Sequence, residues 1–283
     1  MPKRPTKFSL VLATINRIVE LERFLSSLNA QTYRDFELIV VDQNTDDRLV
    51  SLLKKYESCF PITHLRSTKG LSHARNIGLK YITGDIVCFP DDDCWYSPQL
   101  LCDVFNFFQD SQGLVGVTGI TVNEKGEESV TNWDKLDGYI TKLNVWRRCT
   151  SISIFLKSFV FENQRISFDE RLGVGAKTPW GAGEDNDLIL SAISLGRVYY
   201  TRNIVVGHRK NEANDLNQYR ALSYGRGMGK VLRKHAYPVW FVGYLLIKPL
   251  GGAIISILLG KWSKAVYHKA LIIGRYQGWR SEI

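Results

Sequence analysis

The first hundred residues alternate short apolar runs with segments of helical periodicity, and this alternation limits the possible folds more than any other feature. The apolar runs predict buried strands over 8–13, 36–41, 61–65 and 85–89. Apolar residues recur at helical spacing over 17–31, 47–58 and 71–82. Repeated strand–helix units predict an α/β fold with a mostly parallel, doubly wound sheet flanked by helices. Ligands of such sheets bind at the carboxyl ends of the strands.

Beyond residue 110 the alternation is less regular. We expect further strands over 114–122 and 151–156, a helix over 184–195 and a basic helix over 210–236. Three glycines at 225, 227 and 229 weaken the last helix by about 1 kcal/mol each. We place a domain boundary after residue 210, between an α/β domain over 1–210 and a helical tail over 211–283.

The net positive charge of the chain comes from its C-terminal quarter. The net charge is +9, yet residues 1–207 hold 24 Lys and Arg against 25 Asp and Glu, whereas residues 208–283 hold 13 against 3. This basic excess predicts a local anionic partner. The five cysteines contain no CxxC pair, so the sequence predicts no zinc site of that type.

The tail combines its basic residues with an apolar stretch. Residues 238–259 contain one charge, and their length would suffice to span a bilayer. Lys248 and Pro249 stand at its centre, where the charge is costly in lipid and the proline breaks a helix. We therefore predict two short helices lying in the membrane interface, followed by a basic, aromatic-rich helix over 261–280 that contacts anionic lipid. The alternative is that these helices cover the protein's own core.

Three adjacent carboxylates, Asp91, Asp92 and Asp93, directly follow the fourth predicted strand. Because like charges repel, a bound divalent cation is the simplest reason to place them there, and oxygen ligands suit Mg²⁺ or Mn²⁺. The alternative is a solvated acidic turn.

Two other polar segments fall at positions where such a sheet binds ligands. Asp42 and Asn44 follow the second strand, where the acid is a candidate acceptor for a ribose or a base N–H, or else part of a helix cap. Gly70-Leu-Ser-His-Ala-Arg-Asn76 opens the third helix, whose N–H groups and Arg75 suit a phosphate.

The acidic segment Gly181-Ala-Gly-Glu-Asp-Asn-Asp187 opens the helix over 184–195. Acids in a first turn are favoured by the helix dipole, which is one explanation for them. The other is a general base that takes a proton from a hydroxyl nucleophile.

In order and spacing, these segments resemble family 2 of the inverting glycosyltransferases, which have the GT-A fold, and in particular those that build bacterial surface polysaccharides and O-antigens. The likeness covers about residues 7–210 and includes Ala13-Thr-Ile-Asn-Arg17 at the end of the first strand. The resemblance implies a nucleotide pocket lined by Thr14, Asn16, Arg17, Asp42, Asn44, Arg75, Asn76, Asp91 and Asp92. It implies metal ligation by Asp93, with Asp91 and His208 as further candidates, and a catalytic base at Asp185 beside Glu184. For His208, a place in a polar loop is the alternative.

The resemblance further implies metal-dependent transfer, with inversion, from a UDP-, GDP- or dTDP-sugar to a lipid-linked glycan at the cytoplasmic face of the bacterial inner membrane. A sugar-nucleotide pyrophosphorylase is disfavoured, because such enzymes carry a Gly-rich loop where this chain has Thr14-Ile-Asn-Arg17. A non-catalytic, membrane-bound nucleotide- or lipid-binding protein is a further alternative. Nucleic acid is not an expected partner, since the basic tail is interrupted by long apolar stretches.

Overall fold

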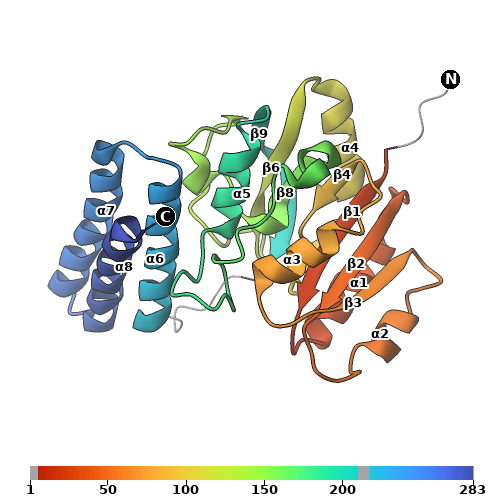
Figure 1. Cartoon of the computed structure of the whole chain (residues 1–283), viewed down its shortest axis with the longest axis horizontal. Coiled ribbons are helices and arrows are strands. Elements are labelled where there is room, and N and C mark those ends of the chain that lie inside the picture. Colours follow the sequence, from red (N-terminus) through yellow and green to blue (C-terminus); the bar gives the residue numbers. More distant parts are fainter. Residues whose placement is uncertain (1–5, 210–216, 283) are drawn as a thin grey trace. The chain divides into compact units, whose positions relative to one another are not determined.

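The structure is a computed structural model that describes residues 6–209 and 217–282, and its strands pair into one mixed sheet (Figure 1). The strand order is β3-β2-β1-β4-β8-β6-β9-β5, with β7 paired to β9. The strands are β1 (Phe8–Thr14), β2 (Phe36–Asp42), β3 (Ile62–Arg66), β4 (Ile86–Cys88), β5 (Cys94–Tyr96), β6 (Leu114–Val122), β7 (Gly138–Tyr139), β8 (Ile154–Lys157) and β9 (Arg197–His208).

The half of the sheet formed by β3, β2, β1 and β4 is parallel throughout, as its strand–helix alternation predicts. The other half is mixed, because β8 runs antiparallel to both β4 and β6, whereas β6 and β9 are parallel. The short strands β5 and β7 pair antiparallel with β9. The sequence analysis missed β5, β7 and β9, which lie outside the regular repeats.

The described α-helices are α1 (Val19–Asn29), α2 (Val50–Lys54), α3 (Leu71–Leu79), α4 (Leu100–Asp110), α5 (Glu184–Ala192), α6 (Gln218–Lys234), α7 (Val239–Leu258) and α8 (Trp262–Arg280). One buried cluster joins α1, α2 and α4 to alternate residues of β1 and β2, so these helices cover one face of the sheet. On the other face α3 packs closely at Gly78, where a Cβ would lie 2.5 Å from Val11. Residues 210–216 of the basic helix predicted over 210–236 lie outside the described residues.

The chain folds as two compact units. The first contains the sheet and comprises residues 6–69, 73–167 and 188–209, and the second comprises 70–72, 168–187 and 217–282. The second unit thus contains the three C-terminal helices and also the segment 168–187, which the sequence division after residue 210 assigns to the α/β domain.

Helix α7 corrects the prediction of two short helices in the tail. It runs unbroken from Val239 to Leu258 with Pro249 inside it. A proline at 249 leaves the carbonyl of Leu245 without its usual backbone donor, and the guanidinium of Arg275 on α8 donates to that carbonyl instead. Burial lowers the pKa of Arg275 from its ordinary value. A side chain from a neighbouring helix therefore allows the proline to remain inside α7.

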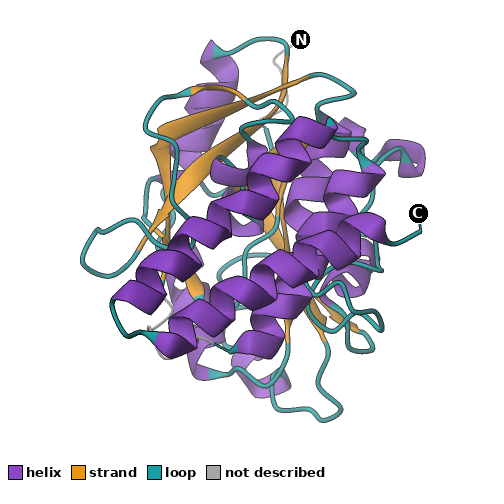
Figure 2. Ribbon diagram, turned by 90° about the vertical axis from the view of Figure 1, so that its left-hand side faces the viewer, coloured by secondary structure: helices purple, strands orange, loops and turns teal. Residues whose placement is uncertain are grey.

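Helices α6 and α8 approach through their backbones, and Figure 2 shows the three long helices of the second unit side by side. A Cβ at Gly225 of α6 would lie 2.7 Å from the carbonyl oxygen of Leu271, and one at Gly229 would lie 2.1 Å from that of Arg275. A Cβ at Gly278 of α8 would lie 2.0 Å from the carbonyl oxygen of Arg226 on α6. The glycines that weaken α6 as an isolated helix are thus the residues that permit this packing.

We expect Arg275→Met to destabilise the second unit by about 1–3 kcal/mol, because it leaves the Leu245 carbonyl unpaired. Adding Pro249→Ala restores a backbone N–H at that position, so the double variant should recover part of the loss. Urea unfolding of the two single variants and the double variant measures the coupling. Additive effects of the two substitutions would contradict this account.

Candidate active site

The carboxyl ends of β1, β2 and β4 meet at one edge of the sheet in the first unit. Thr14 and Asp42 are in register at the ends of β1 and β2, and Asp91, just beyond β4, bridges to Ala13. Parallel pairing therefore brings together the polar residues that the sequence places after three separate strands.

Asp92 is the interior member of the acidic triplet. Its residue is 6% exposed, and its carboxylate accepts hydrogen bonds from Thr14 Oγ1 at 2.7 Å and Arg17 Nη1 at 2.9 Å. Burial raises the pKa of Asp92 to about 6, although Thr14 and Arg17 oppose the shift. Asp92 thus fixes the loop to β1, and its two oxygens are directed at protein donors.

Asp93 joins Arg17 to His208. Arg17 Nη1 donates to Asp93 Oδ2, and His208 Nε2 lies 3.3 Å from Asp93 Oδ1. Burial alone would raise the pKa of Asp93, but His208 and Arg17 hold it at about 2. Burial would likewise lower the pKa of His208, but Asp93 outweighs it and the pKa is raised. The structure therefore brings the predicted metal candidates Asp93 and His208 together.

The pairing of β5 with β9 places His208. Cys94, directly after the triplet, is in register with His208, and Trp95 is in register with Gly207. A Cβ at Gly207 would lie 2.0 Å from the Trp95 ring, so only glycine lets that ring lie flat on β9. The guanidinium of Arg23 covers the same ring at 3.9 Å. The sequence analysis missed Trp95, Gly207 and Arg23, because a three-residue strand carries no periodic signal.

Asp91 is the most exposed member of the triplet, with 34% of its side chain accessible to solvent. It accepts a hydrogen bond from Arg75 at 2.9 Å. Arg75 itself is fully buried. Arg75 is therefore directed at Asp91, and its contact with a phosphate stays a prediction. Asn76 follows Arg75 on α3 and is half-buried.

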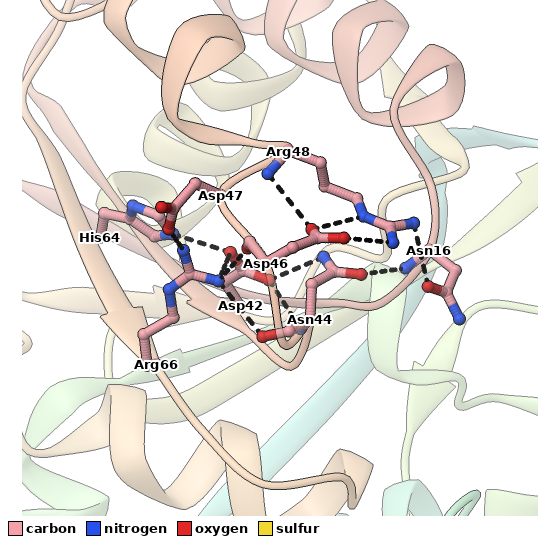
Figure 3. A network of polar contacts seen from close by, with 8 residues as sticks. All are labelled: Asn16, Asp42, Asn44, Asp46, Asp47, Arg48, His64 and Arg66. Atoms are coloured by element: carbon pink, nitrogen blue, oxygen red, sulfur yellow. Dashed lines mark hydrogen bonds and ion pairs between the residues drawn. The ribbon is translucent and has the colours of Figure 1, made fainter.

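The Asp42 carboxylate organises a polar network, shown in Figure 3. It is fully buried, and Oδ1 accepts from the backbone N–H of Asn44 at 2.8 Å and from the Asn44 amide at 2.7 Å. Oδ2 lies 2.9 Å from Arg66 and 3.0 Å from His64. Protein groups thus engage both oxygens of Asp42, and a direct bond to a ribose or base stays a prediction.

The side chains of His64 and Arg66 were missed by the sequence analysis. They are two positions apart on β3 and therefore lie on one face of it, a spacing that is visible in the sequence. Arg66 also donates to the carbonyl of Asp46 at 2.6 Å and to the Asp47 carboxylate at 2.6 Å. It thereby ties the loop after β2 to the neighbouring strand.

Asn16 connects this network to the loop after β1. Its φ of 58° lies in the left-handed region, which asparagine tolerates better than most residues. Its N–H donates to Asn44 Oδ1 at 2.8 Å, and its own Oδ1 accepts from Arg48 at 3.1 Å (Figure 3). Asn16, Asp42 and Asn44 therefore form one connected set of polar groups.

The candidate general base belongs to the second unit. Glu184 and Asp185 stand in the first turn of α5, where Glu184 is buried and Asp185 is half-buried. Gly183 precedes them with a φ of +98°, a conformation that favours glycine. Glu184 packs against Gly173, where a Cβ would lie 3.0 Å from its carboxyl carbon.

Solved structures that resemble this chain place its fold in the GT-A class. TarS (residues 1–349) of Staphylococcus aureus in complex with UDP-GlcNAc aligns with a TM-score of 0.65 and 16% identity, covering 93% of this chain and 91% of that structure. The mannosyltransferase PcManGT of Pyrobaculum calidifontis, in complex with GDP-Man and Mn²⁺, aligns with a TM-score of 0.65 and 12% identity, covering 99% and 89%. The predicted GT-A fold is confirmed.

Residues 9–162 match the sequence profile described as "Glycosyl transferase family 2". The chain belongs to that family, and the resemblance inferred from its motifs is confirmed.

Among curated relatives, the GalNAc(5)-diNAcBac-PP-undecaprenol beta-1,3-glucosyltransferase of Campylobacter jejuni is 26% identical over 224 residues, covering 72% of this chain and 69% of that protein. The chain spans only 21% to 31% of the length of three other relatives that it matches.

The hydrogen bond from Thr14 to Asp92 provides a test of this arrangement. We expect Thr14→Val to cost about 1–3 kcal/mol of unfolding free energy, because a buried carboxylate loses a donor while the side chain keeps its volume. Thr14→Ser retains the hydroxyl and should cost less. Urea denaturation of both variants is the measurement, and equal stabilities would show that the hydroxyl does not support Asp92.

Proposed function

We propose that this glycosyltransferase is metal-dependent and inverting, and that it moves a sugar from a nucleotide-diphosphate sugar to a hydroxyl of a lipid-linked glycan. The observation that supports this best is the pairing of Asp93 with His208, beside Asp91, at the carboxyl edge of the sheet. Asp91 and Asp93 supply the oxygen ligands that Mg²⁺ and Mn²⁺ prefer.

The chemistry of these residues fits a divalent cation. Two adjacent ligands of an octahedral cation lie about 3.0 Å apart, and Asp93 Oδ1 and His208 Nε2 are 3.3 Å apart. His208 Nδ1 lies 2.6 Å from the carbonyl oxygen of Arg209, which can only accept, so Nδ1 carries a proton, and Nε2, which faces Asp93, is the nitrogen that would bind a cation after losing its own proton. Within the described residues no three acidic, His or Cys side chains form a metal cluster, so diphosphate oxygens and waters would complete the coordination.

The nucleotide of the donor would bind at the connected polar set around Asp42. Asn16 and Asn44 lie there together with Arg48 and Arg66, and Thr14 with Arg17 supports the neighbouring acidic triplet. The similar structures contain UDP-GlcNAc in one case and GDP-Man in the other, so UDP-, GDP- and dTDP-sugars all remain candidate donors.

The proposed reaction is a single displacement. The Asp185 carboxylate takes the proton of the acceptor hydroxyl, and the resulting oxygen forms a bond to the anomeric carbon on the face opposite the nucleotide. The bond from that carbon to the diphosphate oxygen breaks, and its electron pair leaves with the nucleoside diphosphate, which inverts the anomeric centre. A bound cation would offset the negative charge that develops on the diphosphate.

A lipid-linked acceptor is supported by the surface of α7 in the second unit. Trp240, Ile247, Ile254 and Leu258 are exposed on one side of this helix, while residues such as Phe241, Leu245 and Ala253 are buried on the other. By length and composition α7 could cross a membrane, with a mean hydropathy of 1.8. An exposed apolar surface of this extent indicates a binding surface.

The occupant that fits this surface is anionic lipid. Residues 208–283 hold 13 Lys and Arg against 3 Asp and Glu, and Lys248, Lys261 and Lys264 are exposed near the apolar residues of α7. The Campylobacter relative is described as acting on an undecaprenol-linked glycan, a lipid substrate. These observations support our proposal that the protein acts at the cytoplasmic face of the bacterial inner membrane.

The central experiment screens UDP-, GDP- and dTDP-sugars for nucleotide release, with Mn²⁺ and after treatment with EDTA. We expect Mn²⁺-dependent release from one donor, and a fall in turnover of about 10²-fold or more in Asp185→Asn, because the base is lost while the donor site is intact. Asp110→Asn, an exposed acid on α4, is the matched control and should behave like the wild type.

Three outcomes would contradict this proposal. Full activity after EDTA treatment would show that the reaction does not depend on a metal. Wild-type turnover in Asp185→Asn would show that Asp185 is not the general base. Absence of turnover with every donor and with bacterial lipid acceptors, together with absence of Mn²⁺-dependent nucleotide binding, would favour the non-catalytic lipid-binding alternative.

The membrane part of the proposal is tested by flotation with vesicles. We expect the protein to float with vesicles that contain anionic phospholipid and to float less with neutral vesicles or at high salt. Ile254→Asp should reduce flotation, because it places a charge on the apolar side of α7, whereas Val19→Asp, an exposed apolar position on α1, should not. No flotation of the wild type, or a dimer in sedimentation that Ile254→Asp dissociates, would identify the surface as a protein interface.

A further inference from the structure

Residues 168–187 contain the candidate base Asp185 and are called the base segment here; they pack against helix α6. Within the second unit, a Cβ at Gly227 of α6 would lie 2.0 Å from the carbonyl oxygen of Ala182, so the two backbones touch. Ser223 of α6 accepts a hydrogen bond from the N–H of Gly181 at 3.1 Å and donates to the carbonyl of Pro179 at 3.3 Å. Residues 179–182 of the base segment are thus in direct contact with α6.

Lys234, in the last turn of α6, contacts both ends of this segment. Its ammonium donates to Asp187 Oδ2 at 2.9 Å and to Asp169 Oδ2 at 3.0 Å. The Asp187 side chain is 1% exposed, and its other oxygen lies 2.7 Å from His235 Nε2. Asp169 also accepts from Arg171 at 2.9 Å. One half-buried cation therefore fixes residues 169 and 187, between which the rest of the segment runs.

The anchored acid and the candidate base share the first turn of α5. Residues two apart on a helix project about 200° from each other. Asp187 is directed at α6 and is buried, whereas Asp185 is half-buried. Because Asp187 is held, rotation of this turn about the helix axis is restricted, and the direction of the Asp185 carboxylate is restricted with it.

We propose that Lys234 is a positioning residue for the general base: by bridging Asp169 and Asp187 it fixes the orientation of the first turn of α5, and so of Asp185. This inference rests on the proposed function, in which Asp185 is the base. Lys234 itself contacts neither the acceptor nor the donor in this account. Because the two acids are largely buried, desolvation offsets much of the attraction of these ion pairs, and we expect them to contribute more to a defined geometry than to net stability.

The experiment compares Lys234→Met with Arg233→Met, which removes the same charge from the adjacent, exposed position of α6. We expect Lys234→Met to lower kcat for glycosyl transfer by about 10²-fold, because a misplaced base slows the chemical step. The donor KM should change by no more than about twofold, since donor binding is not involved. Lys234→Arg retains a cation between the two acids and should recover most of the activity.

Amide hydrogen exchange supplies a readout that does not depend on activity. Faster exchange over residues 181–187 is expected in Lys234→Met and not in Arg233→Met. If Lys234→Met does not fold, Asp169→Asn replaces it, because it weakens one side of the bridge and leaves the contact from Lys234 to Asp187.

The outcomes separate this inference from the proposed function. Equal kcat and equal exchange in Lys234→Met and Arg233→Met would overturn the positioning role. So would a loss of activity in Lys234→Met that appears entirely in the donor KM. Wild-type protein without transferase activity would overturn the proposed function alone, and the exchange measurement would still decide whether Lys234 orders the segment.

Discussion

Three carboxylates in succession repel one another, and at the edge of the sheet the charges of Asp91, Asp92 and Asp93 are offset by basic and hydroxyl partners. In chain order these are Arg75, then Thr14 with Arg17, then Arg17 with His208. Two of the acids share one guanidinium, so the loop after β1 and the loop after β4 depend on each other. The network around Asp42 joins the same edge through Asn16, and the candidate donor site is thus one connected polar structure.

Much of this edge could be predicted from the sequence. The end of each apolar run marks the carboxyl end of a strand, and in a parallel sheet these ends lie at the same edge. The apolar runs located β1, β2, β3 and β4 to within one or two residues, and each polar group that follows a strand lies at the expected edge. The order of the motifs also indicated the family, which the profile match confirms. The assignment of nucleotide, metal and base roles to individual residues stays a prediction.

Contacts that join distant parts of the chain could not be predicted in this way. His208 reaches Asp93 through an antiparallel pairing with a strand of three residues, too short to produce a pattern. Arg275 compensates for Pro249 from another helix, so a local rule about proline gave two helices where one exists. Lys234 appeared as one more basic residue of the tail, although it bridges Asp169 and the buried Asp187.

The glycines of α6 have a further consequence for cooperativity. They lie on two sides of one helix, with Gly225 and Gly229 against α8 and Gly227 against the base segment. Because three glycines make an isolated helix of this length unstable, we expect α6 to form only when both neighbours are in place. The base segment, α6 and α8 should therefore order and melt as one cooperative unit. In such a molecule the C-terminal tail is a folding partner of the candidate catalytic segment as well as a candidate lipid anchor.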